Sequence, residues 1–172
     1  KADREFFDRA KRLEFISNFG VGYDSVNIDI ADEKKVIVTN TPTSVTEATA
    51  ELAMALMLSL LRRVAECDRK LRTDPNLKWG LMYNLGETLY GLNLGIIGLG
   101  RIGKAIARRA VTFGMKIYYH NRNRIDEVTE KEYKATYLSK EELLKKSDVL
   151  VLALPLTKES FHLISEKELS RS

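Results

Sequence analysis

Short apolar segments with different periods follow one another in the first forty residues. Residues 3–12 carry apolar side chains at helical spacing, which predicts a helix. Residues 14–20 predict a short strand that runs into a glycine loop, and residues 36–40 predict a second strand. A short helix is expected between them, at residues 27–35. The order helix, strand, helix, strand is typical of an α/β layer.

A single long helix is predicted from residue 44 to residue 72, because apolar residues recur along it on most of its sides. A helix that is apolar on most sides is buried on most sides. Two interpretations stay open: a core helix of one domain, or a helix shared between domains or subunits. Residues 73–91 follow as a loop that contains Pro75, Trp79 and three glycines.

The pattern changes at Leu92, from where apolar strands alternate with helices. LNLGIIGLG predicts a strand that enters a glycine turn, and residues 101–113 predict a helix that ends at Gly114. Residues 115–120 predict a second strand. Residues 147–155 predict a third, almost wholly apolar, as expected for a parallel sheet covered on both faces. This alternation predicts an α/β fold with a Rossmann-type, doubly wound parallel sheet.

Capping boxes mark the starts of two further helices. In this motif a serine is followed three residues later by a glutamate, and each side chain bonds a free backbone N–H group. The pairs are Ser139 with Glu142, and Ser165 with Glu168.

Three glycines follow the first of the later strands with the spacing G-x-G-x-x-G: Gly98, Gly100 and Gly103. The spacing alone is a weak signal, but here it follows an apolar strand and opens a helix, which favours dinucleotide binding. The first glycine allows a tight turn, the second lets the backbone approach a pyrophosphate, and the third lets helix and strand pack closely. The phosphates then lie at the helix N-terminus, where free N–H groups and the macrodipole favour anions. The alternatives are a tight turn without a ligand, or a methyl donor such as S-adenosylmethionine, which fits the third glycine less well.

The end of the second strand bears on the choice of cofactor, because an acid there binds the adenosine ribose and selects NAD. Here the strand ends at His120 and Asn121, and Asp126 lies several residues further on. Without that carboxylate a 2′-phosphate is not repelled, and Arg122 and Arg124 could bind it through charge-assisted hydrogen bonds. One such contact is worth roughly 1.5–3 kcal/mol, or roughly a ten- to hundred-fold preference. The stretch therefore predicts NADP, the alternative being two solvent-exposed arginines in a loop.

Composition and charge narrow the classes of function. Of the 172 residues, 44% are hydrophobic and 30% charged, which is a globular composition with enough apolar material for a core. The net charge of +4 is mild, and Lys and Arg are mixed with Asp and Glu, so we expect no nucleic-acid partner. No uncharged apolar run reaches membrane-spanning length, and the charged start of the chain does not predict a signal peptide. The single cysteine, Cys67, fits a reducing compartment. We therefore expect a cytoplasmic protein, and we assign no metal site.

Four segments together resemble the D-isomer-specific 2-hydroxyacid dehydrogenases. They are VGYDSVNID (21–29), TPTSVTEATAELAMALMLSLLRR (41–63), GLNLGIIGLGRIGKAIARRAVTFGMKI (91–117) and SDVLVLALPLTKESFHLIS (147–165). The resemblance covers nearly the whole chain. Within the family, the YHNRNR segment is most similar to the NADPH-using glyoxylate, hydroxypyruvate and 2-ketogluconate reductases. The NAD-linked lactate and phosphoglycerate members typically carry Asp where this chain has Asn121.

The resemblance implies two domains and a reaction. Residues 1–42 would be the later part of a flavodoxin-like substrate domain, and residues 43–172 an NAD(P)-binding domain that is incomplete at its C-terminal end. The helix at residues 44–72 would cross between the domains and form a homodimer. The expected reaction is hydride transfer from NADPH to a small 2-keto acid of the glyoxylate or hydroxypyruvate type, which gives a D-2-hydroxy acid. An NAD-linked dehydrogenase stays open as an alternative, as does a non-catalytic dinucleotide-binding module that dimerises.

The resemblance also implies roles for single residues. The backbone N–H groups of Val21 and Gly22 would hold the substrate carboxylate, and Arg101 and Ile102 would lie at the pyrophosphate. The adenosine side would be formed by Leu154, Pro155 and Ser160. For the first two of these, an apolar strand end without a ligand is the alternative.

No catalytic residue is expected within this chain. Reduction of a 2-keto acid needs a cation for the carboxylate and a general acid near the carbonyl. In the family these are an Arg, and a His paired with an acid, and all three follow the segment where this chain stops. His120 and His162 both lie on the adenosine side of the predicted fold, so we assign them structural roles. The chain is therefore expected to be a fragment that does not turn over by itself.

Overall fold

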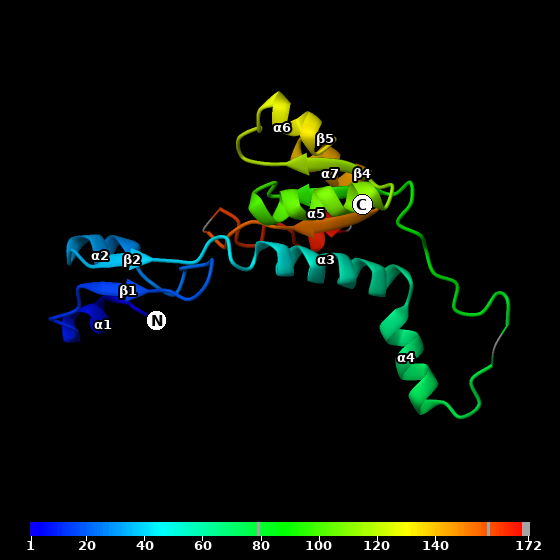
Figure 1. Ribbon diagram of the computed structural model, residues 1–172, viewed down its shortest axis with the longest axis horizontal. Helices are drawn as coiled ribbons and strands as arrows, with labels where there is room; N and C mark the ends of the chain where they lie inside the picture. Colours follow the sequence, from blue (N-terminus) through cyan, green and yellow to red (C-terminus); the bar gives the residue numbers. More distant parts are fainter. Residues whose placement is uncertain (79, 158, 170–172) are drawn as a thin grey trace. The chain divides into compact units, whose positions relative to one another are not determined.

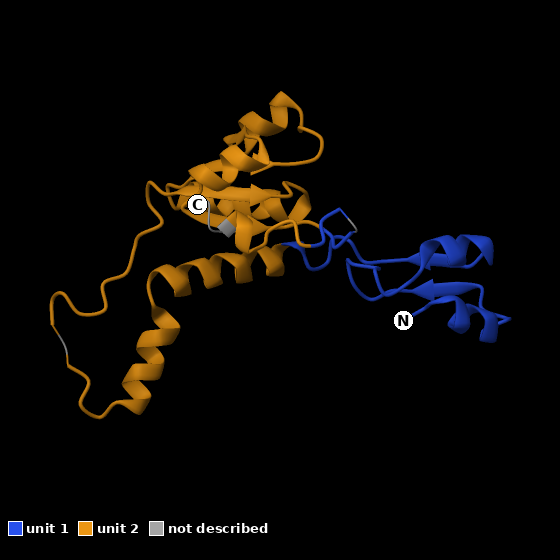
Figure 2. Cartoon of the chain, turned by 180° about the vertical axis from the view of Figure 1, so that it is seen from behind, with its two compact units in different colours: residues 1–46, 155–161 blue, residues 47–154, 162–172 orange. Residues whose placement is uncertain are grey.

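The computed structural model describes residues 1–78, 80–157 and 159–169, and the chain forms two compact units (Figure 2). Unit 1 comprises Lys1–Thr46 and Pro155–Phe161. Unit 2 comprises Glu47–Leu154 and His162–Ser172. Trp79, which the sequence places in a loop, lies outside the described residues.

Unit 1 is built on a pair of parallel strands (Figure 1). An apolar cluster packs against one face of the pair. Its elements are α1 (Arg4–Arg9), β1 (Phe15–Ser17), α2 (Ile28–Glu33) and β2 (Ile37–Thr39). The buried core consists of Phe7, Ile30, Ala31 and Val36, and Ile16 and Val38 pack against it from the strands. The opposite face of the strands is open, and the Ile37 side chain on it is 63% exposed. The order of elements is the one that the sequence predicts.

Polar caps start both helices of unit 1. The Asp3 carboxylate accepts a hydrogen bond from the Phe6 N–H at 3.2 Å, and the Asn27 amide oxygen accepts one from the Ile30 N–H at 3.1 Å. These bonds satisfy donors that a helix leaves free in its first turn. They support helices of only six residues each, which would be marginal without caps and packing.

The prediction of a single helix over residues 44–72 is wrong, because two helices occupy this stretch: α3 (Thr46–Leu61) and α4 (Val64–Thr73). Between them Arg63 adopts a left-handed backbone conformation with φ 56°, which ends the regular hydrogen-bond ladder. The Arg63 guanidinium also binds the Glu66 carboxylate through two hydrogen bonds of 2.6 and 2.7 Å. Within the described residues of this single chain, the burial expected on most sides is reached on one side only. Only one stripe of α3 is buried in unit 2, whereas Leu56 on another side is 63% exposed and α4 has no buried residue.

Unit 2 contains a four-stranded parallel sheet in the order β5–β4–β3–β6 (Figure 1). The strands are β3 (Asn93–Ile97), β4 (Lys116–His120), β5 (Ala135–Tyr137) and β6 (Val149–Leu152). The helices that alternate with them are α5 (Arg101–Thr112), α6 (Glu127–Glu132), α7 (Lys140–Lys146) and α8 (Glu166–Leu169). From β3 the chain adds strands outward to β5 and then returns to place β6 on the other side of β3. This reversal confirms the Rossmann-type fold and directs attention to the carboxyl ends of β3 and β6, where such sheets bind ligands.

Helices cover both faces of this sheet. Gly95 of β3 lies against Ser147 at the end of α7, and the next residue, Ile96, lies against Gly103 of α5. Because successive side chains of a strand point to opposite faces, α5 and α7 cover opposite faces. The buried core includes the following residues of β3, α5 and α3: Leu94, Ile96, Ala105, Ile106, Ala110, Ala50, Met54 and Met57. The almost continuous apolar character of the strands follows from this double cover.

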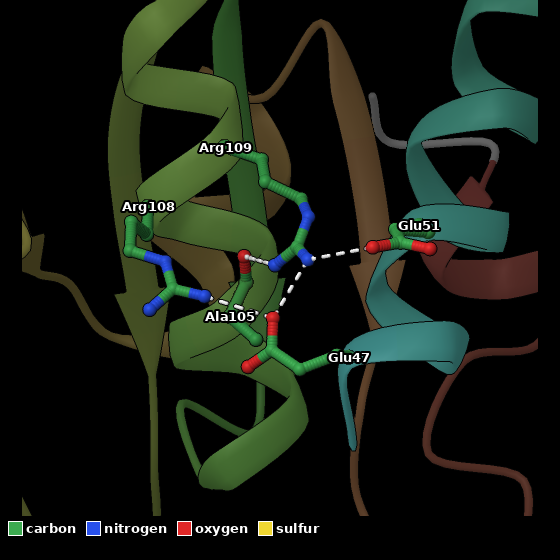
Figure 3. A network of polar contacts seen from close by, with 5 residues as sticks. All are labelled: Glu47, Glu51, Ala105, Arg108 and Arg109. Carbon is green, nitrogen blue, oxygen red and sulfur yellow. Dashed lines mark hydrogen bonds and ion pairs between the residues drawn. The ribbon is translucent and has the colours of Figure 1, made fainter. Parts of the chain in front are cut away.

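A cluster of ion pairs joins α3 to α5 beside this core (Figure 3). One Glu47 carboxylate oxygen accepts hydrogen bonds from Arg108 at 2.8 Å and Arg109 at 2.7 Å, and Arg109 also reaches Glu51 at 3.2 Å. The Glu47 side chain is 58% exposed, and such exposed pairs contribute only about 0–1 kcal/mol each. Burial of one side chain such as Ile106 contributes roughly 1.5–3 kcal/mol. Apolar packing therefore contributes more than the ion pairs to the contact between unit 2's core and these helices.

Residues 126–137 form a helix and a strand that the hydrophobic pattern does not reveal. The Asp126 carboxylate caps α6 by accepting a hydrogen bond from the Thr129 N–H at 2.8 Å, and β5 follows with only three residues. The predicted capping box of Ser139 with Glu142 is present at the start of α7. At the start of α8 the Glu168 carboxylate accepts from the Ser165 N–H at 3.0 Å and from the Ser165 hydroxyl, while the Glu168 N–H donates to the Ser165 carbonyl at 3.1 Å, so only the glutamate half of the second box is formed. Among the helices of the described residues, none has the length and apolar character needed to cross a membrane.

Candidate functional site

The turn after β3 is held tightly against the end of β6. Gly98 has φ +98°, a conformation that residues with a side chain rarely adopt. A Cβ at Gly98 would lie only 2.5 Å from the Ala153 carbonyl oxygen, so the first position of the motif requires glycine for two reasons. The Gly98 N–H donates to the His120 carbonyl at 3.0 Å, which ties the same turn to the end of β4.

The other two glycines differ sharply in their surroundings. A Cβ at Gly103 would lie 2.3 Å from the Gly98 carbonyl oxygen, so this glycine lets α5 begin directly beside β3. A Cβ at Gly100 would meet nothing within 4 Å, and its φ of −85° is open to any residue. The fold therefore requires Gly98 and Gly103, whereas at Gly100 no steric contact with the described residues requires a glycine, and its backbone is open to approach.

The N-terminus of α5 has the electrostatics of an anion site. Lys104 is the first residue whose N–H finds a helical acceptor, the Gly100 carbonyl at 2.9 Å. The N–H groups of Arg101, Ile102 and Gly103 have no carbonyl one turn earlier in the helix. The first turn carries no acid, and Arg101 adds an exposed positive charge. The macrodipole, the free donors and this side chain all favour a negative ligand. Ile102 packs against the core with its side chain, so only its backbone is available.

Asn121, directly after β4, braces the glycine turn. Its amide oxygen accepts a hydrogen bond from the Leu99 N–H at 2.7 Å, and Leu99 itself is buried. The oxygen is thus used by the protein, and the amide NH₂ group, a donor only, is the part left for a ligand. Nothing in the sequence indicates this bond, because it joins residues 22 positions apart.

Arg124 forms an ion pair with Glu130 of α6. Two hydrogen bonds of 2.8 Å join its guanidinium to both carboxylate oxygens of Glu130, and the guanidinium lies 5.8 Å from the centre of the Tyr137 ring. The buried Tyr119 hydroxyl donates to the same carboxylate at 2.6 Å and accepts from the Ile125 N–H at 3.2 Å. The pair uses two of the five N–H donors of Arg124. Glu130 therefore fixes the loop after β4 and partly neutralises one of the two predicted phosphate ligands.

The pKa values in this network follow from its hydrogen bonds. The bonds from Arg124 and then from Tyr119 lower the pKa of Glu130 to about 2. Burial, and then the bond to Glu130, raise the pKa of Tyr119 to about 12. Glu130 is therefore a carboxylate, and Tyr119 a neutral donor, over the whole neutral range.

Arg122 and His120 are placed differently from Arg124. Arg122 is exposed, and within the described residues it makes no hydrogen bond or ion pair, so its charge is available to a ligand. His120 lies with its Nδ1 2.9 Å from the Leu138 carbonyl and its ring stacked on Tyr137 at 5.8 Å. This packing agrees with the structural role expected for His120.

The predicted adenosine-side residues lie beyond β6. In unit 2, the Leu154 N–H nitrogen lies 3.1 Å from the position that a Cβ on Gly98 would take, which puts Leu154 beside the glycine turn. In unit 1, the Ser160 hydroxyl donates to the Pro155 carbonyl at 2.7 Å and accepts from the Thr157 N–H at 2.6 Å. Ser160 therefore closes its own loop.

The loop that contains Val21 and Gly22 has its carbonyl groups tied back to the protein. The Asn18 amide donates to the carbonyl oxygens of Gly20 at 3.2 Å and Gly22 at 2.8 Å, and the Asn40 amide donates to that of Val21 at 2.9 Å. In the part of the chain that the structure describes, the N–H groups of Val21, Gly22 and Tyr23 have no partner. These are the donors that a carboxylate needs. The sequence pattern named Val21 and Gly22 but gave no reason to single out the two asparagines.

Comparison with known proteins shows which family the chain matches. A family model described as "D-isomer specific 2-hydroxyacid dehydrogenase, NAD binding domain" matches residues 54–172. A glyoxylate reductase from Thermococcus gammatolerans is 47% identical over 173 residues, which cover 98% of this chain and 52% of that relative. The chain thus spans about half the length of the curated relatives it matches.

Two solved structures extend the comparison. A glyoxylate reductase from Paecilomyes thermophila is similar with a TM-score of 0.83 and 40% identity, over 94% of this chain and 48% of that one. A D-lactate dehydrogenase from Aquifex aeolicus, solved in complex with NAD and lactic acid, gives a TM-score of 0.89 and 33% identity, over 99% of this chain and 50% of that one.

The Glu130 network predicts a specific pH dependence of stability. Because the folded pKa of Glu130 is about 2, below its ordinary 4.5, its contribution is present above the ordinary value and is lost as the pH falls toward 2. Glu130→Gln should lower the free energy of unfolding by a constant amount above about pH 5, and by progressively less toward pH 2. Urea titrations followed by circular dichroism at a series of pH values measure this difference. Glu87→Gln, which removes an exposed glutamate of unit 2, is the control. A deficit for Glu130→Gln that does not change with pH would contradict the assignment.

Proposed function

This chain belongs to the D-isomer specific 2-hydroxyacid dehydrogenase family, and on that premise we propose that the whole protein reduces a small 2-keto acid with NADPH. The substrate is of the glyoxylate or hydroxypyruvate type, and the product is a D-2-hydroxy acid. The observation that carries the proposal is Gly100, which the fold does not require and which leaves the N-terminus of α5 open. The two domains of the protein are assigned to residues 1–42 and 43–172.

The residues around the glycine turn fit a dinucleotide. The N–H groups of Arg101, Ile102 and Gly103 receive the pyrophosphate, and the bare Gly100 allows it to approach the backbone. The Arg101 side chain balances part of its charge. Leu154, beside the glycine turn, is assigned to the adenosine side, and the resemblance to the family assigns Pro155 and Ser160 to the same role. When bound, a reduced nicotinamide dinucleotide supplies the hydride for the reaction.

The loop after β4 favours a 2′-phosphate over a bare ribose. Asn121 presents only its NH₂ donors, since its oxygen is bound to the Leu99 N–H, and a phosphate accepts such donors. Arg122 is unpaired within the described residues and supplies the main charge. Arg124 keeps three of its five donors free beside Glu130 and contributes less, because that carboxylate already compensates it.

The substrate carboxylate is assigned to the backbone N–H groups of Val21 and Gly22, to which the structure adds that of Tyr23. These donors carry no charge, so they orient a carboxylate without holding it strongly. An arginine of the whole protein would supply the missing positive charge, as the family resemblance implies.

One observation favours a second candidate, an NAD-linked dehydrogenase. Glu130 places a carboxylate next to Arg124 and so weakens the positive field that a 2′-phosphate needs. The similarity to a D-lactate dehydrogenase that binds NAD supports the same alternative. The difference between the two candidates lies mainly in the contribution of Arg122.

We also propose a homodimer formed through the stretch at residues 44–72. Large apolar side chains on α3 and α4 and in the loop that follows are exposed: Leu52, Leu56, Leu60, Val64, Leu71, Leu81 and Met82. An apolar surface of this extent on one unit is typical of an interface.

Sedimentation velocity should give a dimer for the wild type and a monomer for Leu56→Glu. Val128→Glu, at an exposed apolar position on α6, should remain dimeric, and a wild-type monomer at micromolar concentration would contradict the proposal.

Calorimetric titration with NADPH and with NADH tests the cofactor assignment. We expect NADPH to bind roughly ten- to hundred-fold more tightly, because one charge-assisted contact is worth about 1.5–3 kcal/mol. Arg122→Ala should remove most of this difference, Arg124→Ala a smaller part, and Arg12→Ala, in unit 1, none of it. Equal binding of the two cofactors by the wild type would overturn the NADPH preference in favour of NAD. Failure to bind either would contradict the dinucleotide site itself.

A further inference from the structure

We propose that Asn18 and Asn40 are positioning residues for the substrate carboxylate, acting through the backbone of residues 20–23, here called the carboxylate loop. This inference rests on the proposed function, in which the N–H groups of Val21 and Gly22 hold that carboxylate. Neither asparagine needs to touch the substrate. Their role is to hold the carbonyl groups of the loop so that its N–H groups face outward.

The first support is the number of carbonyls that the two side chains control. Both hydrogens of the Asn18 amide are used, one on the Gly20 carbonyl at 3.2 Å and one on the Gly22 carbonyl at 2.8 Å. Asn40 binds the carbonyl between them, that of Val21, at 2.9 Å. The Gly20 carbonyl also accepts from the Thr41 N–H at 3.0 Å. Three successive peptide groups are therefore held by their oxygens.

The positions of these three carbonyl groups also determine where the N–H groups of the following residues point. In a planar trans peptide the C=O of one residue and the N–H of the next point in opposite directions. The carbonyls of Gly20, Val21 and Gly22 therefore fix the N–H groups of Val21, Gly22 and Tyr23, respectively. Since the carbonyls point to the two asparagines, the N–H groups point away from them. Within the described residues these three donors have no partner, so they are open to a ligand.

The two asparagines stand on a rigid base. Asn18 directly follows β1 and Asn40 directly follows β2, and Ser17 pairs with Thr39 in the parallel ladder. The Asn18 N–H donates to the Thr39 carbonyl at 2.8 Å, which continues the ladder to the base of the loop. Both side chains thus start from the same edge of the sheet. A site supported from strand ends is held more precisely than one supported by a loop alone.

The chemistry of the side chain matters as much as its position. An amide is a neutral donor, so it binds a carbonyl without adding charge near the substrate. An aspartate of the same shape would repel the loop carbonyls and also the substrate carboxylate. One carboxylate already lies close to the carboxylate loop, because the Asp24 Oδ1 is 3.1 Å from the position that a Cβ on Gly22 would take. An aspartate in place of either asparagine would add a second negative charge there.

Amide-resolved NMR of the whole protein, which also supplies the arginine, tests the proposal with oxamate as a stable 2-keto acid analogue and NADPH present. In the free wild type the amides of Val21, Gly22 and Tyr23 should exchange rapidly with solvent, and oxamate should shift the first two. Asn18→Ala and Asn40→Ala should each weaken oxamate binding about ten-fold, and Asn40→Asp by more. The affinity for NADPH and the thermal midpoint should stay close to wild type, because the change is confined to the loop. Asn76→Ala, at an exposed asparagine of unit 2, should change nothing.

The outcomes distinguish the positioning role of the two asparagines from the assignment of the substrate carboxylate to Val21 and Gly22. If oxamate shifts Val21 and Gly22 in the wild type and both alanine variants bind it equally well, the positioning role is overturned and the substrate assignment stands. If oxamate leaves these amides unchanged in the wild type, both are overturned. If the three amides of the free protein are protected from exchange, the positioning role fails whatever the ligand does, because the donors then already have partners.

Discussion

The close approach of α5 to β3 at Gly103 is the constraint on which the rest of unit 2 depends. A Cβ there would come within 2.3 Å of the Gly98 carbonyl, so no other residue lets the helix start so near the strand. This start aims the N-terminus of α5 at the carboxyl edge of the sheet, where the strand order reverses between β3 and β6. The free N–H groups at the N-terminus of α5, the open backbone at Gly100 and the contact of the turn with Asn121 all lie at this approach.

In both units an asparagine side chain at the end of a parallel strand hydrogen-bonds the backbone beside a group of N–H donors that are unpaired within the described residues. In unit 2, Asn121 after β4 accepts from the Leu99 N–H, which fixes the turn that leads into the donors of α5. In unit 1, Asn18 after β1 and Asn40 after β2 donate to carbonyls and so fix the donors of the following peptides. In each case a neutral amide at the end of a parallel strand binds a backbone group of the following loop or turn and so fixes where nearby N–H groups point. Neutral amides suit both places, because each unit is expected to receive an anion and an acid would oppose it.

The sequence predicts most of the features that depend on neighbouring residues, and it fails for those that depend on contacts between residues far apart in the chain. The strand before Gly98 and the tight turn at its end could be predicted from the sequence. A buried parallel strand is apolar throughout, and a phosphate-binding turn has glycines at fixed spacing. The break at Arg63 could not be predicted, since an Arg–Glu pair three residues apart looks like ordinary helix stabilisation in a sequence. The pairing of Arg124 with Glu130 and the two asparagines of the carboxylate loop depend on tertiary contacts. The register of β1 and β2, rather than any motif, brings Asn18 and Asn40 together.

The most direct test of the central claim compares Gly100→Ala with Gly103→Ala. A Cβ at position 100 meets nothing within 4 Å, so Gly100→Ala should keep the thermal midpoint of the wild type but lose at least about ten-fold in NADPH affinity, because the methyl group occupies the approach to the N-terminus of α5. Gly103→Ala should instead lower stability by about 1–3 kcal/mol, as overpacking does. If Gly100→Ala binds NADPH as tightly as the wild type, the turn does not receive a pyrophosphate and the account of this site is wrong.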